Sequence, residues 1–88
     1  MTTKESQGLP SKEGEFITFD LGLSSALVTM GYEIISIDKT ERKKVKFIFQ
    51  DSEGLCKATK EYWNNELKIN ARTFFENQKM LKNRIYSD

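Results

Sequence analysis

The 88-residue chain contains no histidine and only one cysteine and one proline, and these scarcities exclude several kinds of site. A single cysteine, Cys56, cannot form a disulfide within one chain, and the usual zinc ligand sets need histidine or more cysteines. Without histidine the usual catalytic triads and His-based acid–base sites are also missing. Cys56 lies in an apolar helical stripe, so we interpret it as a small buried hydrophobe. We therefore expect a protein that is not an enzyme and holds no metal.

Long apolar runs and phosphate-binding loops are absent as well. No run is long enough to span a membrane, and the N-terminus lacks the apolar region of a signal peptide, so we expect a cytoplasmic protein. The five glycines are scattered, and none of them forms a P-loop or a dinucleotide-binding fingerprint. We therefore expect no cofactor. The formal net charge is only +1, so a nucleic-acid site would have to arise from local charge.

The pattern that is present is that of one small α+β domain. Residues 1–15 are polar and interrupted by glycine and proline, which is typical of a flexible N-terminal segment, and the domain follows over residues 16–88. Within it we expect a short strand or arm, a helix, an antiparallel hairpin and two C-terminal helices. Their expected ranges are 16–19, 21–30, 32–37 with 45–50, a helix that starts after 51–52 and extends to about 67, and a last helix after 70.

Capping residues and periodicity define the helices. Asp20 is a suitable N-cap for the first helix, and Gly31 can end that helix in the left-handed conformation. We interpret Ser24 and Ser25 as small residues that allow close packing. Asn70 caps the last helix, whose inward positions recur at helical spacing: Ala71, Phe74, Phe75, Gln78, Leu81 and Ile85.

The expected hairpin is apolar on both faces. Strand alternation places Phe47 and Phe49 on one face of the second strand and Ile48 on the other. In the first strand Ile37 is expected on the face opposite to Ile34. A sheet with one solvated face does not show this pattern, so either helices cover both faces or a second subunit covers one. A homodimer is therefore one of the partner hypotheses.

Two basic clusters, at the hairpin tip and in the last helix, carry the only hint of function. Their proposed nucleic-acid contacts are Lys39, Arg42, Lys43, Lys44, Lys46, Lys79, Lys82 and Arg84. If both clusters lie on one side, they form a basic strip, and such strips supply most of the non-specific affinity for nucleic acid. The alternative is that both are solvated surfaces without a binding role. The near-neutral overall charge favours a protein-interaction module instead.

Several segments together resemble a known family. They are residues 18–23 (TFDLGL), Leu27, Gly31, residues 47–51 (FIFQD), Phe75 and residues 81–85 (LKNRI). The chain resembles, over about residues 16–85, a family of short uncharacterised proteins of Gram-positive bacteria, their phages and mobile elements. This resemblance implies an accessory protein of phage or mobile DNA. Two hypotheses therefore remain: nucleic-acid binding, with DNA preferred to RNA, or an inhibitor or adaptor that binds a host protein.

Overall fold

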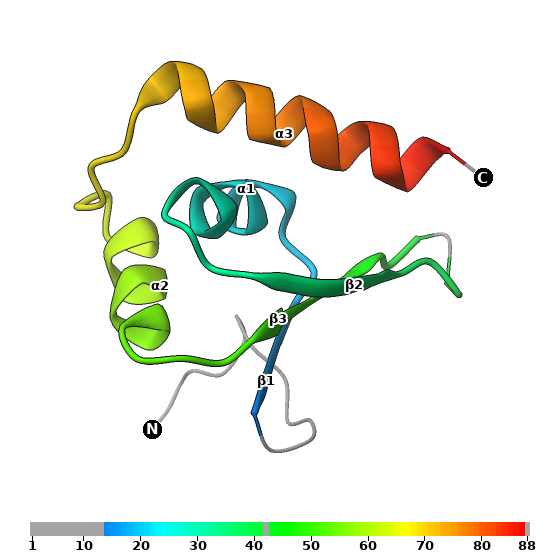
Figure 1. Cartoon of the computed structure of the whole chain (residues 1–88), viewed down its shortest axis with the longest axis horizontal. Helices are drawn as coiled ribbons and strands as arrows, with labels where there is room; N and C mark the ends of the chain where they lie inside the picture. Colours follow the sequence, from blue (N-terminus) through cyan, green and yellow to red (C-terminus); the bar gives the residue numbers. More distant parts are fainter. Residues whose placement is uncertain (1–13, 42, 88) are drawn as a thin grey trace.

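The computed structural model describes residues 14–41 and 43–87, which form three strands and three helices (Figure 1). The elements are β1 (Glu15–Thr18), α1 (Leu21–Thr29), β2 (Ile34–Asp38), β3 (Lys46–Gln50), α2 (Leu55–Trp63) and α3 (Ala71–Tyr86). The expected α+β order of strand, helix, antiparallel hairpin and two helices is confirmed. Most of the segment expected to be flexible lies outside the described residues, although Glu15 belongs to β1.

The strands form an antiparallel sheet in the order β1-β3-β2, so β3 is central. Phe16 of β1 pairs with Phe49, and Thr18 pairs with Phe47. The first apolar segment is thus an edge strand and not a free arm. Pairing on both sides satisfies the backbone groups of β3, which allows this strand to place its aromatic side chains in the interior.

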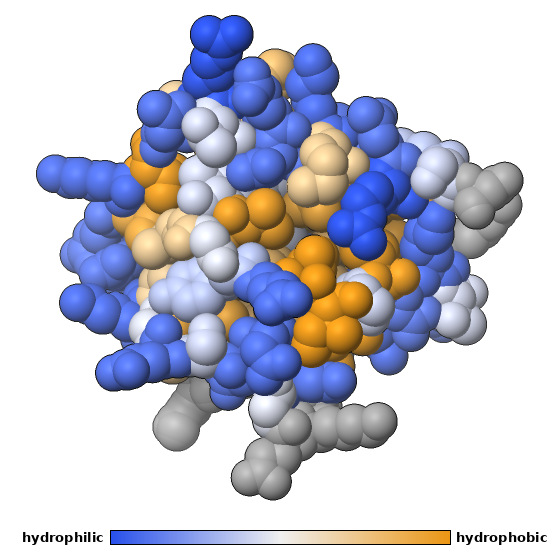
Figure 2. Space-filling model, in the orientation of Figure 1, coloured by the Kyte–Doolittle hydropathy of each residue, from blue (hydrophilic) through white to orange (hydrophobic). Residues whose placement is uncertain are grey.

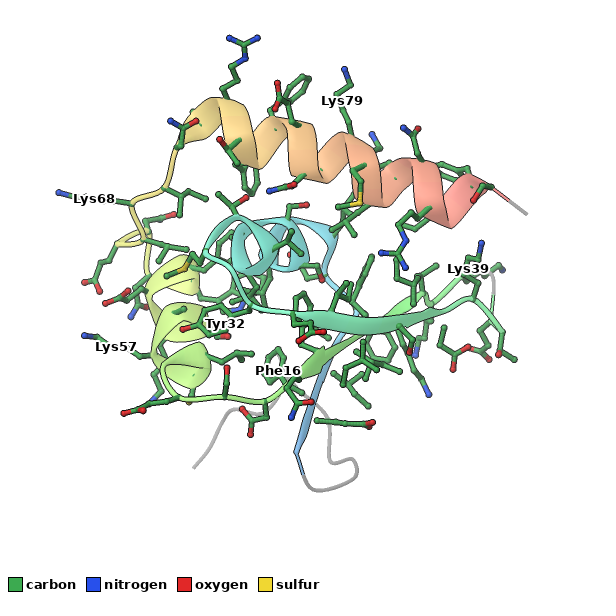
Figure 3. The ribbon with its side chains drawn as sticks, in the orientation of Figure 1. Phe16, Tyr32, Lys39, Lys57, Lys68 and Lys79 are labelled. Carbon is green, nitrogen blue, oxygen red and sulfur yellow. The ribbon has the colours of Figure 1, made fainter. Side chains whose placement is uncertain are left out.

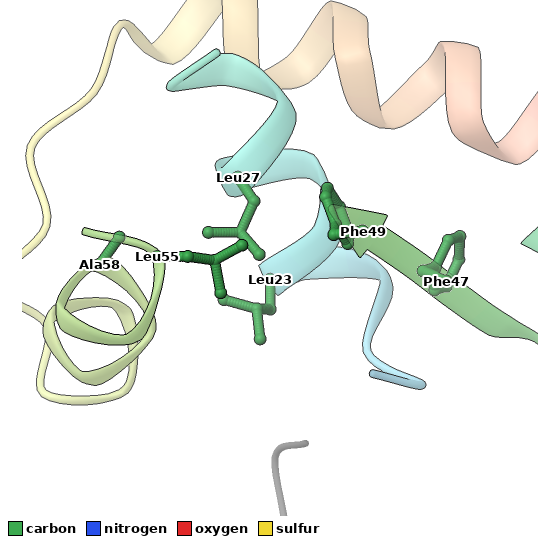
Figure 4. Close-up of a cluster of buried hydrophobic side chains, with 6 residues drawn as sticks. All are labelled: Leu23, Leu27, Phe47, Phe49, Leu55 and Ala58. Atoms are coloured by element: carbon green, nitrogen blue, oxygen red, sulfur yellow. The ribbon is translucent and has the colours of Figure 1, made fainter. Parts of the chain in front are cut away.

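The hydrophobic core lies between one face of the sheet and the helices α1 and α2 (Figure 4). Phe47 and Phe49 of β3 pack there with Leu23 and Leu27 of α1 and with Leu55 of α2, and all five side chains are buried. Burying a side chain of this size stabilises the fold by about 1.5–3 kcal/mol. These residues therefore fix α1 and α2 on the same face of the sheet.

Helix α1 lies between the sheet and α3 (Figure 1). Residues 23–27 are all buried, which requires neighbours on more than one side of the helix. Ser24 and Ser25 are completely buried, as expected for small residues at close helix contacts. Ser25 Oγ donates a hydrogen bond of 2.8 Å to the carbonyl of Leu21. Ser24 Oγ has no hydrogen-bond partner among the described residues.

Both ends of α1 are closed as the sequence predicts. The carboxylate of Asp20 accepts a hydrogen bond of 2.7 Å from the backbone amide of Leu23. At the other end Gly31 has φ +100°, and the amide of Tyr32 donates to the carbonyl of Leu27 at 3.0 Å. This is the pattern of a Schellman motif, in which a left-handed glycine ends the helix.

The hairpin contains an irregularity that strand alternation does not reveal. Ile34 and Ile37 both pair with buried aromatic residues of β3, and the register shifts between Ile34 and Ser36. Both isoleucines pack against the core, so the prediction that they lie on opposite faces is wrong. A β-bulge places two residues opposite one and changes the alternation beyond it. Ile35 lies at this bulge and is 46% exposed.

Two predictions about helix faces are wrong for one reason. Cys56 is exposed, and Phe75 is 56% exposed, although both were expected on inward faces. Successive residues of a helix are rotated by about 100°. Cys56 follows the buried Leu55, and Phe75 follows the partly buried Phe74. In each case one rotation carries an apolar side chain out of a narrow inward face.

Helix α2 is shorter than its apolar pattern predicts. Gly54 is its N-cap, with φ +90° and no side-chain hydrogen bond, and the helix ends at Trp63 and not near residue 67. Asn65 has φ +61°, a left-handed conformation that asparagine tolerates better than most residues. The chain then turns toward α3. Taken over the part of the chain that the structure describes, no helix is long and apolar enough to cross a membrane.

We predict that Ser24→Ala raises the free energy of unfolding by about 1 kcal/mol, because it removes a buried hydroxyl without a described partner and places a better helix former in α1. Urea denaturation would measure it. Ser25→Ala is the matched control, since it also deletes a hydrogen bond and should change stability little. A destabilised Ser24→Ala protein would mean that the hydroxyl has a partner.

We also predict that Gly31→Ala lowers the free energy of unfolding by about 1–2 kcal/mol. No atom lies within 4 Å of the position that a Cβ would take, so the cost comes from the left-handed backbone alone. Gly31→Asn should cost less, because asparagine accepts this conformation. Equal losses for both variants in thermal unfolding would contradict this explanation.

Candidate nucleic-acid interface

The first candidate element is the tip of the β2–β3 hairpin, residues 38–46. It carries five basic and two acidic side chains. Lys43 and Lys44 are exposed, whereas Arg42 lies outside the described residues. The connection is held by a turn in which the amide of Lys44 donates to the carbonyl of Glu41 at 3.1 Å. Lys43 and Lys44 are thus presented to solvent at one end of the sheet.

Asp38 reduces the positive charge of this tip. Its carboxylate accepts a hydrogen bond of 2.9 Å from the amide of Thr40. Hydrogen bonds from the side chain and backbone of Thr40 lower the pKa of Asp38, and the charge of Lys46 lowers it further. Asp38 therefore stays ionised at neutral pH and lies opposite Lys46 in the strand pairing.

Lys39 joins the hairpin to the end of α3. Its Nζ donates to the carbonyl oxygens of Arg84 at 3.0 Å and of Ser87 at 2.7 Å. The last carbonyls of a helix lack intrahelical partners and carry partial negative charge, which a lysine can satisfy. Figure 3 shows Lys39 at the end of the hairpin near the C-terminal end of α3. In this position its amine links the hairpin to the C-terminal end of α3.

Helix α3 presents its cations on two separate flanks. Its inward side is marked by the buried Leu81 and by Ile85, which packs against the core. Lys82 and Arg84 are two residues apart, which is about 200° around the helix. They therefore lie on opposite flanks of the inward side. Lys79 projects from α3 on the side away from the sheet (Figure 3), and by helical spacing Lys82 shares its flank.

A stripe of cations and two aromatic rings runs along that flank, and the sequence analysis missed it. Phe75 is 56% and Tyr86 is 80% exposed, and the Nζ of Lys79 lies 5.4 Å from the centroid of the Phe75 ring. We call these residues the α3 stripe: Arg72, Phe75, Lys79, Lys82 and Tyr86. Their spacing of three or four residues is visible in the sequence, but assigning Phe75 to the core concealed it.

Charge along the α3 stripe is partly compensated. Arg72 Nε lies 3.3 Å from Glu76 Oε2, one turn further along the helix. Exposed pairs of this kind contribute little to stability, so Arg72 can exchange its partner at low cost. The side chains of Lys79 and Lys82 are exposed. Two lysines and two rings are thus the main polar and stacking groups of this surface.

The eight predicted contacts do not form one continuous strip. Two of these contacts, Lys39 and Lys79, are labelled in Figure 3, where they project from different sides of the molecule. The structure brings the hairpin tip to the C-terminal end of α3 through Lys39, but Lys79 points away from the hairpin. Two separate surfaces therefore remain, the tip with Lys43 and Lys44 and the α3 stripe.

Comparisons with known proteins add a family but no activity. In the part of the chain that the structure covers, no three Cys, Asp or Glu side chains gather where they could hold a metal ion. No curated protein and no solved structure matched the chain. One family model matches residues 13–87, which is most of its length. The chain therefore belongs to the family described as Domain of unknown function (DUF5659).

Proposed function

We propose that this protein is a non-enzymatic nucleic-acid-binding protein that holds a single strand against the α3 stripe, with Lys43 and Lys44 as a second contact. The observation that supports this proposal is the interleaving of exposed aromatic rings with lysines along one flank of α3. Proteins that bind single strands combine these two groups, because bases stack on aromatic side chains while cations contact the backbone.

In the described residues, the rings of Phe75 and Tyr86 are more exposed than the other large hydrophobic side chains. An apolar ring that remains in water does not gain the free energy that burial would provide. Phe75 lies outside the inward side of α3, where a ring could be buried. The stripe extends from residue 72 to residue 86, which is about 21 Å along the helix axis. A surface of this length can contact several nucleotides. The rings would stack on bases, and Lys79 and Lys82 would contact phosphates.

The resemblance to proteins of phages and mobile elements favours DNA over RNA as the ligand. On this basis we extend the proposal to an accessory role on phage or mobile DNA, which is an argument by analogy with the family. The lysine contacts themselves are to phosphate, and such contacts carry no base sequence information. Binding through this surface would therefore show little sequence preference.

The rival proposal is a protein-interaction module without nucleic-acid affinity, acting as inhibitor or adaptor of a host protein. Exposed apolar side chains in β2 and directly after β1 favour it: Ile35 is 46% and Phe19 is 39% exposed. Exposed apolar patches commonly mark protein contacts. This surface is separate from the α3 stripe, so the two proposals predict different effects of the same substitutions.

We predict that the full chain binds oligo(dT) with micromolar affinity. The logarithm of its association constant should fall linearly with the logarithm of the salt concentration. Fluorescence anisotropy titrations at several salt concentrations would measure this. Lys79→Ala/Lys82→Ala should reduce the slope by about 1.4, since each phosphate contact on a single strand contributes about 0.7. Phe75→Ala should weaken binding by about 1–3 kcal/mol through lost stacking.

The matched control is Lys57→Ala/Lys68→Ala, which removes the same charge from another side of the molecule (Figure 3). It should leave the slope almost unchanged. Lys43→Glu/Lys44→Glu tests the hairpin contact in the same titration. Absence of binding at low salt would exclude the proposal and leave the interaction module. An equal loss in the control and in the α3 variant would show that only overall charge matters.

A further inference from the structure

One face of the sheet is not covered by the helices. The core residues of α1 and α2 pack on the face that carries Phe47 and Phe49. On the other face Ile17 of β1 pairs with Ile48 of β3, which in turn pairs with Ser36 of β2. Neither Ile17 nor Ile48 belongs to the core cluster or to the side chains packed against it. We call this surface the open face.

Exposed apolar side chains extend the open face on both edges. Phe19 directly follows the last residue of β1 at one edge, and the bulge leaves Ile35 next to Ser36 at the other. Phe19 and Ile35 are 39% and 46% exposed. Figure 2 shows hydrophobic side chains reaching the surface over β2, framed by hydrophilic ones. An apolar strip thus crosses all three strands in the middle of the open face.

The two ends of the open face differ in charge. At one end Glu15 pairs with Gln50, and the Gln50 amide donates to the carbonyl of Glu33, so two carboxylate side chains flank this row. At the other end the Nζ of Lys44 lies 5.8 Å from the centroid of the Phe19 ring. Lys46 is on the same face, opposite Asp38. An acidic end and a mainly basic end therefore border the apolar strip.

We propose that the open face binds the open face of a second copy of this chain, with the strands of the two copies antiparallel. A two-fold axis across the strands places apolar strip on apolar strip and the acidic end of each copy over the basic end of the other. The opposite choice, an axis along the strands, would place Glu15 over Glu33 of the partner copy. Like charges in an interface are costly, so the charge polarity selects the antiparallel arrangement.

The size of the open face predicts a weak dimer. Three strands of about five residues cover roughly 15 Å by 16 Å, or about 240 Å². Standard interfaces bury about 800 Å² per partner. Sheets that pack face to face are separated by about 10 Å, a distance that isoleucine and phenylalanine side chains can fill. The dimer would leave α3 on the outer side of each copy, so it is independent of the α3 stripe, and only Lys44 at the hairpin tip belongs to both proposed surfaces.

We predict that the full chain dimerises at high micromolar concentration in sedimentation velocity experiments, and that Ile35→Lys weakens the dimer about tenfold or more. Ile35 is on an edge strand and half-exposed, so the variant should fold. Ile48→Thr, which keeps a β-branched side chain in the central strand, should have the same effect. Met80→Lys is the matched control, because it introduces the same charge at an exposed apolar residue of α3.

A chain that stays monomeric at high micromolar concentration would overturn the proposal, as would a dimer that Ile35→Lys and Ile48→Thr leave intact. Circular dichroism of each variant would verify that it is folded. A full chain that dimerises but does not bind oligo(dT) would refute only the proposed function. A full chain that binds oligo(dT) but stays monomeric would refute only the dimer.

The charge polarity gives a test of the arrangement itself. Glu15→Lys and Lys44→Glu should each weaken the homodimer, because each places like charges opposite one another. An equal mixture of the two variants should form a dimer again, since the heterodimer restores opposite charges at both positions. If Glu15→Lys strengthens the homodimer, the strands of the two copies are parallel and the proposed arrangement is wrong.

Discussion

The burial of α1 from two sides is the constraint on which the fold depends. Residues 23–27 are buried without interruption, so the helix must be covered by the sheet and α2 on one side and by α3 on the other. Serines at 24 and 25 keep its surface small enough for close approach. Asn77 of α3 adds a polar link, since its Nδ2 donates to Thr29 Oγ1 at 3.0 Å. With one helix in the centre, both α2 and α3 are used to cover it.

This use of the helices explains why one face of the sheet stays open. A three-stranded sheet has two faces, and the only helices in the described part of the chain gather around α1 on one of them (Figure 1). The apolar character of Ile17 and Ile48 then has no partner among the helices. The same arrangement turns one flank of α3 outward, which exposes Phe75 and Tyr86. Both proposed surfaces thus follow from the central position of α1.

The sequence predicted the elements well because their signals are local. Asp20, Gly31 and Asn70 act at helix ends through bonds to nearby backbone groups, and these bonds are present in the structure. The faces were harder to predict. A bulge between Ile34 and Ser36 changed the alternation of β2, and the inward faces of α2 and α3 are narrower than their apolar patterns. Bulges and face widths depend on tertiary packing, which periodicity does not contain.

The candidate site was predicted only in part for a similar reason. Composition identifies the basic residues, but their directions depend on how the hairpin meets α3. Lys39 was expected to contact phosphate, and the structure shows that its amine binds the carbonyls of Arg84 and Ser87. The α3 stripe was visible as a spacing of three and four residues. It could not be separated from the core pattern until the inward side of α3 was known.

The most direct test of the proposed function is an NMR titration of the ¹⁵N-labelled chain with oligo(dT). Backbone amide shifts report where a ligand binds, residue by residue, without any substitution. The account predicts that the largest shift changes follow the α3 stripe, with smaller ones at Lys43 and Lys44 and almost none in α2. Unchanged spectra at saturating oligonucleotide, or changes centred on α2 or on the open face of the sheet, would contradict it.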